Sequence, residues 1–102
     1  MIYVIATIRT TPGRRDDFLA AFRDLVPQVR AEPGCIAYEP SVDIQSGVAA
    51  QAPLRNDAVV VVEKWQDLES LKRHLATPHV SQFLVKAKDL LAGLDIQVLA
   101  PA

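Results

Sequence analysis

The sequence predicts one α+β domain in which a helix follows the first strand and another helical region follows the third of four strands. Three observations lead to this prediction. The chain has 102 residues, the size of one small domain. Its apolar residues switch between the alternating spacing of strands and the three- and four-residue spacing of helices. Prolines and glycines stand between these segments, where turns are expected.

The charge balance narrows the possible partners. Lys and Arg total 11 and Asp and Glu total 12, which gives a formal net charge of -1. Nucleic acid and anionic membranes bind concentrated positive charge, so neither is expected as a partner. We find neither a signal peptide nor the roughly 18–20 apolar residues that span a bilayer.

The cysteine and histidine content points to a reducing compartment. Cys35 is the only cysteine, so no internal disulfide can form, and the cytoplasm is the expected location. Only His74 and His79 could join it as ligands, which makes a structural zinc site unexpected. We therefore expect no bound metal.

The first strand and helix have clear patterns. Residues 2–9 are rich in β-branched and aromatic side chains, which is typical of a strand. From Arg14 onward an apolar stripe with helical spacing follows, formed by Phe18, Phe22, Leu25 and Val29. We expect Pro27 to kink this helix or loosen its last turn. Residues 32–34 then end it.

The middle of the chain predicts two more strands. Residues 35–44 form the second strand, with Pro40 indicating an edge position. Residues 45–57 are small, lack a clear period and predict a long irregular loop. Residues 58–65 are the clearest strand, and their four consecutive valines indicate burial on both faces.

The last third predicts a divided helix and a final strand. Asp67 is placed to cap a short helix that directs Leu68, Leu71 and Leu75 inward. Pro78 then starts a second helical piece, which we expect Gly93 to end. Residues 94–99 alternate as the last strand.

The resulting order, β-α-β-β-α-β, is that of a ferredoxin-like (split βαβ) fold. One sheet face packs on the helices, and nothing in the chain remains to cover the other. Half of the residues are hydrophobic, a high fraction for a domain this small. We therefore expect a homodimer in which a second sheet covers the free face.

Three segments resemble a known family: residues 32–39 (Glu-Pro-Gly-Cys-Ile-Ala-Tyr-Glu), residues 63–71 (Glu-Lys-Trp-Gln-Asp-Leu-Glu-Ser-Leu), and residues 74–79 (His-Leu-Ala-Thr-Pro-His) followed by Phe83. Their order and spacing are similar to those of the antibiotic biosynthesis monooxygenase (ABM) domain family. The resemblance covers almost the whole chain. It implies a dimeric α+β barrel.

For function, the resemblance implies a small monooxygenase that oxidises a quinol- or polyphenol-like aromatic with dioxygen and without a cofactor. The absence of flavin, nicotinamide and phosphate-binding motifs is consistent with that chemistry. Two alternatives remain open. One is an isomerase of a small phosphorylated keto sugar, which would need Arg55, Lys64 or Arg73 in its pocket. The other is a non-enzymatic dimeric binding module. A haem-degrading role ranks last, because Ala6 and Thr7 stand where such members carry an asparagine.

His74 and Tyr38 are the candidate catalytic residues. His74 flanks the inward stripe of the short helix, and an imidazole can take a proton from a phenolic hydroxyl near neutral pH. Alternatively, it is a structural histidine bonded to a carboxylate such as Glu63 or Glu39. Tyr38 can donate a hydrogen bond to a substrate oxygen, or it is a structural tyrosine beneath the helices.

Further candidates would bind substrate rather than react with it. Trp65, Phe22 and Phe83 are expected in the core first and as aromatic pocket walls second. His79 begins the second helical piece, where it either lines the pocket or serves as a cap or surface residue. Asn56, at the end of the long loop, is a weaker candidate for orienting a substrate carbonyl.

Overall fold

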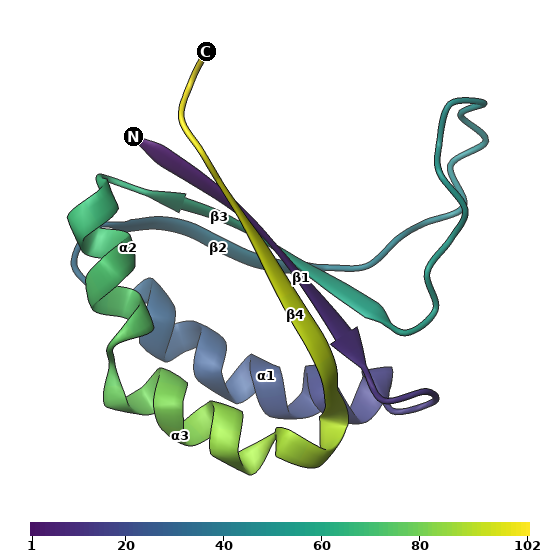
Figure 1. Cartoon of the computed structure of the whole chain (residues 1–102), viewed down its shortest axis with the longest axis horizontal. Coiled ribbons are helices and arrows are strands. Elements are labelled where there is room, and N and C mark those ends of the chain that lie inside the picture. Colours follow the sequence, from purple (N-terminus) through teal and green to yellow (C-terminus); the bar gives the residue numbers. More distant parts are fainter.

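Four antiparallel strands form one sheet in the order β2-β3-β1-β4, and the helices cover one of its faces (Figure 1). The structure, a computed structural model, describes residues 1–102. The predicted ferredoxin-like order is confirmed. None of the helices is long and apolar enough to cross a membrane. The elements are β1 (Ile2–Thr10), α1 (Arg15–Arg30), β2 (Cys35–Ser41), β3 (Ala58–Trp65), α2 (Leu68–Leu75), α3 (Pro78–Lys86), the 3-10 helix η1 (Lys88–Leu90) and β4 (Leu91–Leu99).

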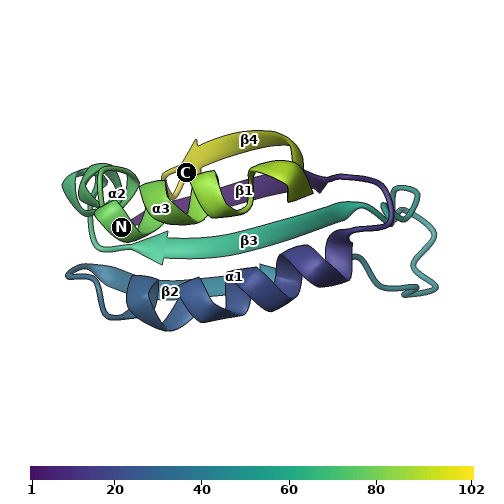
Figure 2. The ribbon, with the colours of Figure 1, turned by 90° about the horizontal axis from the view of Figure 1, so that it is seen from below.

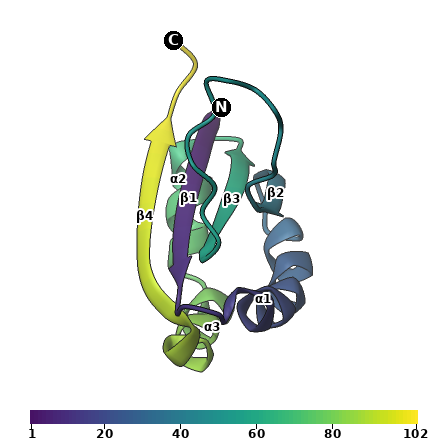
Figure 3. The same cartoon turned by 90° about the vertical axis from the view of Figure 1, so that its right-hand side faces the viewer.

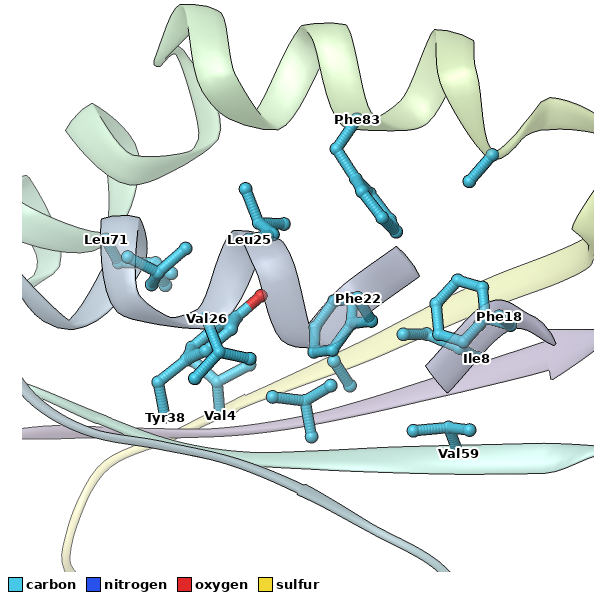
Figure 4. Close-up of a cluster of buried hydrophobic side chains, with 14 of the residues drawn as sticks. Val4, Ile8, Phe18, Phe22, Leu25, Val26, Tyr38, Val59, Leu71 and Phe83 are labelled. Atoms are coloured by element: carbon cyan, nitrogen blue, oxygen red, sulfur yellow. The ribbon is translucent and has the colours of Figure 1, made fainter. Parts of the chain in front are cut away.

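The hydrophobic core lies between the sheet and the helices. Figure 2, seen from below, shows helices α1 and α3 in front of the strands. Alternation along the strands directs one set of side chains toward the helices, among them Val4 and Ile8 of β1 and Val59 of β3. The apolar stripe of α1 meets them with Phe18 and Phe22, whose rings stack at 5.4 Å. Figure 4 shows these groups closing on one another, with Phe83 of α3 reaching down toward them.

The start of α2 and the course of α1 test two local predictions. The Asp67 carboxylate accepts a hydrogen bond from the Ser70 amide at 2.8 Å, so the predicted N-cap is confirmed. We expected Pro27 to kink α1 or to loosen its last turn; that turn stays α-helical to Arg30. Pro27 lies on the exposed side of the helix. There, water can bond the backbone carbonyl that loses its intrahelical partner.

The prediction that three leucines of α2 point inward is correct for only one of them. Leu71 is buried, whereas Leu68 and Leu75 are nearly half exposed. A helix of eight residues presents only a narrow stripe to β3, so its flanking leucines remain at the edge of the contact.

Two predicted boundaries differ from the structure. β2 ends at Ser41 rather than residue 44, because its pairing with β3 ends there. β4 begins at Leu91, so Gly93 lies inside the strand instead of ending a helix. A Cβ on Gly93 would lie 2.7 Å from Cζ of Arg9. The glycine therefore makes room for the Arg9 side chain, which pairs with Asp95.

The opposite face of the sheet carries no helix, as Figure 3 shows from the side. In β3, Val60 is half buried and Val62 is 44% exposed, so the predicted burial of all four valines on both faces does not occur within one chain. Neighbouring strands add Tyr3, Ile5 and Leu99 to this face. The loop of residues 42–57 stands away from the helices, beyond the ends of β2 and β3 (Figure 1).

Gly34 controls how β2 enters the sheet. Its φ is +86°, a conformation that L side chains rarely adopt. A Cβ at this position would also lie 2.6 Å from Cβ of Ser70, in the first turn of α2. The Pro-Gly pair of the 32–39 segment thus has a physical reason: only glycine allows the turn to approach α2 this closely.

We predict that Gly34→Ala lowers the free energy of unfolding by about 3 kcal/mol, combining backbone strain with overpacking against Ser70. Gly13→Ala is the matched control. Its φ is similar, +77°, but nothing lies within 4 Å of the added Cβ, so only about 1 kcal/mol should be lost. Urea unfolding of both variants measures the difference, and equal losses would contradict the role given to Ser70.

Candidate functional site

A cavity of about 100 Å³ lies between the helices and the sheet. All four strands and all three α-helices contribute to its wall, and 14 of its 16 lining residues are hydrophobic when Tyr38 is counted among them. Polar atoms reach the wall from Tyr38 of β2, Glu63 of β3 and His74 of α2. The apolar lining comprises Ala6, Ile8, Phe18, Phe22, Leu25, Val61, Leu75, Val80, Phe83, Leu84, Leu91, Leu94 and Ile96.

His74 is held in one orientation by a buried carboxylate. Its Nδ1 lies 3.0 and 3.1 Å from the two carboxylate oxygens of Glu32, and its side chain is only 4% exposed. Because an ionised carboxylate only accepts hydrogen bonds, this contact assigns the proton to Nδ1. Every fully buried polar side-chain atom has a hydrogen-bond partner. Nε2 of His74 bonds no protein group, so it is not fully buried. Because His74 lines the cavity, Nε2 can accept a proton there.

Glu32 also binds the second histidine. Nε2 of His79, in the first turn of α3, donates to Glu32 Oε2 at 2.7 Å. His79 does not line the apolar cavity. It lies in a polar groove between α1 and α3, together with Asp24, Gln28 and Lys86. His79 therefore lies outside the wall of the apolar cavity, part-exposed, and contacts Glu32 from the side of this groove.

Tyr38 stands on the sheet directly beneath the helices. Its ring stacks on Phe22 at 5.8 Å and meets His74 edge-on at 5.5 Å. Figure 4 shows its hydroxyl at the end that points away from the sheet. Burial, reinforced by the negative charges of Glu63 and Glu32, raises the pKa of Tyr38 well above its usual range. The hydroxyl therefore stays protonated and can act as a hydrogen-bond donor.

Glu63 is a buried carboxyl with one protein hydrogen bond. Trp65, two residues along β3 on the same face, donates its indole N–H to Glu63 Oε1 at 2.9 Å. Burial raises the pKa of Glu63 to about 7; the Trp65 hydrogen bond opposes this shift and the charge of Glu32 adds to it. Glu63 therefore holds its proton to a higher pH than an exposed glutamate does.

The structure brings four of the seven predicted site residues to the cavity wall: His74, Tyr38, Phe22 and Phe83. Trp65 is fully buried behind His74, with ring centroids 4.7 Å apart, so it supports the site without lining it. Sequence reasoning missed Glu32 as the partner of His74, naming Glu63 or Glu39 instead. The sequence did contain a signal for Glu63. It alternates with Val61 and Trp65 along the strand, so an acidic side chain was to be expected on the buried face.

Asn56 lies far from this arrangement. It is exposed in the turn before β3 and does not line the cavity, because the 42–57 loop extends away from the helices. The neighbouring Arg55 is engaged within the loop. Its guanidinium donates to the Asp43 carboxylate at 2.9 and 3.0 Å.

The cavity opens beside strand β4 through an apolar mouth. Four of its lining residues are substantially exposed: Leu75, Leu84, Leu94 and Ile96. No lysine or arginine lines the cavity, and no group of three or more His, Cys, Asp or Glu residues is arranged to hold a metal ion. The arrangement suits a largely apolar ligand with oxygen atoms at one end.

Comparison with known proteins identifies the family. The family model described as "Antibiotic biosynthesis monooxygenase" matches residues 1–86. The chain therefore belongs to the antibiotic biosynthesis monooxygenase (ABM) family, as the three sequence segments indicated.

Similar proteins include two bacterial relatives. The Escherichia coli (strain K12) protein named "Probable quinol monooxygenase YgiN" is 38% identical, covering 99% of this chain and 98% of that protein. The Bacillus subtilis protein named "Putative monooxygenase YcnE" is 35% identical, covering 94% and 93%. The crystal structure of PA3566 from Pseudomonas aeruginosa superposes with a TM-score of 0.80 at 29% identity, covering 99% of this chain and 93% of that one.

The raised pKa of Glu63 predicts a pH-dependent stability. The folded protein holds this proton more tightly than the unfolded chain does. The stabilising contribution is therefore complete below the ordinary value of 4.5 and is lost as the pH rises through about 7. From pH 5 to pH 8, the unfolding free energy of the wild type should fall more than that of Glu63→Gln, by on the order of 3 kcal/mol.

Urea unfolding at the two pH values measures this difference. Glu69→Gln, at an exposed carboxylate of α2, is the control and should behave as the wild type does. Parallel curves for wild type and Glu63→Gln would show that Glu63 ionises in the folded state as easily as in the unfolded chain.

Proposed function

We propose that the protein is a cytoplasmic monooxygenase that oxidises a quinol- or polyphenol-like aromatic with dioxygen and without a prosthetic group. One observation carries the proposal: Nε2 of His74, oriented by Glu32, opens into a cavity walled by aromatic rings. Membership of the ABM family and the printed name of the E. coli relative support oxidation of a quinol.

The reaction balances without another reductant. A hydroquinone ring carbon exchanges its C–H bond for a C–O bond, and the ring is oxidised to a hydroxyquinone. One atom of dioxygen enters the product and the other leaves as water. The substrate supplies all the electrons, so the protein needs only to ionise the ring and bind it in an enclosed space.

Each polar group at the cavity has a role in that ionisation. His74 Nε2 takes the proton of a ring hydroxyl, and the Glu32 carboxylate stabilises the resulting imidazolium through Nδ1. The resulting phenolate is a far better electron donor to dioxygen than the neutral ring. Tyr38, which stays protonated, donates a hydrogen bond to the ring oxygen. Phe22 and Phe83 flank the ring with apolar surface.

The isomerase alternative finds less support at this cavity. A phosphorylated keto sugar requires positive charge, and none of Arg55, Lys64 or Arg73 lines the cavity. Arg55 is paired with Asp43, and the Lys64 ammonium lies over the ring of Tyr3 on the helix-free face. A non-enzymatic binding module would accept the same aromatic ligands without consuming oxygen. Oxygen uptake with a panel of hydroquinones and anthrones distinguishes these functions, since only the monooxygenase consumes oxygen.

His74→Ala should lower kcat by roughly a hundred- to ten-thousand-fold in the oxygen-uptake assay, since the general base is removed. The limb of the pH profile on which activity rises with pH should disappear with it. His79→Gln is the control, because its amide still donates to Glu32 and its effect on kcat should be small. An unchanged pH profile in His74→Ala would move the role of base away from this residue.

We also propose that two copies associate through the helix-free sheet face. Tyr3, Ile5, Val60, Val62 and Leu99 place apolar side chains there, and no element of the chain covers them. Covering such a face with a second sheet removes this surface from water, which favours a homodimer.

Light scattering should give twice the 11.2 kDa mass of the chain. Val62→Asp should shift it toward the single-chain mass, because a charge would be buried at the centre of the interface. Val85→Asp is the matched control, on the helical side of the molecule and 76% exposed, and should leave the dimer intact. A single-chain mass for the wild type at micromolar concentration would contradict the dimer.

A further inference from the structure

We propose that Glu63 is a second catalytic group, a neutral carboxylic acid that donates a hydrogen bond to a carbonyl or phenolate oxygen of the ligand in the cavity. The inference rests on the proposed function, because it assigns a partner to the ring that His74 ionises. It also specifies the ligand class: a ring with at least two oxygen substituents, of which one is a hydrogen-bond acceptor.

The position of Glu63 supports direct contact with the ligand. Glu63 lies on the helix-facing side of β3, is 5% exposed and lines the cavity beside Tyr38 and His74. Oε1 accepts the indole N–H of Trp65 at 2.9 Å, which fixes the direction of the carboxyl group. The other oxygen, Oε2, bonds no protein group. Every fully buried polar side-chain atom has a partner, so Oε2 is not fully buried. Because Glu63 lines the cavity, we infer that Oε2 opens into it.

The charged and titratable neighbours of Glu63 favour its neutral form. The α1–β2 turn contributes Glu32, a like charge, and β2 contributes Tyr38 and the thiol of Cys35. From α2 comes His74, whose Nδ1 is committed to Glu32. Neither a salt bridge nor a hydrogen bond joins Glu63 to a cation. A buried carboxyl group without a cationic partner retains its proton, and its raised pKa agrees.

A protonated carboxyl has an O–H group that needs an acceptor. Because Oε1 is the oxygen that receives the Trp65 hydrogen bond, the proton belongs on the oxygen open to the cavity. Within the protein Glu63 bonds only Trp65, so an oxygen of the ligand can serve as the acceptor for this O–H group. Glu63 and His74 then have opposite requirements: the acid works while protonated and the base works while neutral. Activity should therefore peak near neutral pH, with Glu63 responsible for the fall at higher pH.

Binding of duroquinone tests this assignment without turnover. Its two carbonyls accept hydrogen bonds, and its four methyl groups leave no ring position open to the Cys35 thiol. In calorimetric titrations, the Kd of the wild type should rise about tenfold from pH 6 to pH 8.5, as Glu63 loses its proton. Glu63→Gln keeps an N–H donor and an acceptor for Trp65, so its Kd should stay low and constant across this range.

Two further variants complete the design. Glu63→Leu removes the donor and should bind duroquinone weakly at both pH values. Glu69→Gln, the matched control on exposed α2 surface, should reproduce the wild type. A wild-type Kd that does not change with pH, a Glu63→Gln variant that keeps the pH dependence, or no binding at pH 6 would each overturn the assignment.

The outcome is separable from that of the proposed function. If duroquinone binds with the expected pH dependence while no hydroquinone consumes oxygen, the monooxygenase proposal fails and the role of Glu63 as a ligand donor stands. If oxygen is consumed but the Kd of duroquinone is independent of pH in the wild type, the monooxygenase proposal stands and the role of Glu63 as a ligand donor fails.

Discussion

The site depends on the burial of one carboxylate, that of Glu32. Its side chain is 9% exposed and accepts hydrogen bonds from His74 and His79. These three residues belong to the α1–β2 turn, α2 and α3, so a single charged group joins all the helices at one end of the sheet. A buried charge is tolerated only when it is paired and hydrogen-bonded. The helices are therefore constrained to meet where both imidazoles can reach it, and the same contact fixes the tautomer of His74.

Two buried glutamates of the same chemistry thus acquire different properties. Glu32 has two imidazole partners, whereas Glu63 has one neutral donor, Trp65, and no cation. At Glu63, burial favours the acid form and outweighs the opposing hydrogen bond from Trp65. Through Glu32 the fold orients His74, the proposed base, and through burial it favours the acid form of Glu63 nearby. His74 lies against Trp65, which in turn orients Glu63, so both functions share one packed cluster.

The sequence predicted what local interactions determine. The strand at 58–65, the Asp67 cap and the Pro78 helix start depend on neighbouring residues, and all three were correct. Gly93 was wrongly predicted to end a helix because it pairs with Arg9 of β1, a strand far away in the sequence. The same applies to the site. His74 and His79 meet Glu32 across 42 and 47 residues, a distance over which periodicity carries no information. The family resemblance included Glu32 and Glu63 among its motifs but did not say what each carboxyl contacts.

The distribution of polarity along the cavity restricts how a substrate can sit. The mouth, at the β4 edge, is apolar, and the three polar groups come from β2, β3 and α2. A flat ring with its oxygen atoms toward Tyr38, Glu63 and His74 satisfies each of these groups and leaves its apolar remainder among the leucines of the mouth. A ligand polar along its whole length would leave hydrogen-bonding groups unpaired against the apolar wall, at a cost of about 1–3 kcal/mol for each group. The cavity therefore selects ligands by where their oxygen atoms stand, and ring hydroxyls are brought to the base by the exclusion of polar atoms from every other part of the wall.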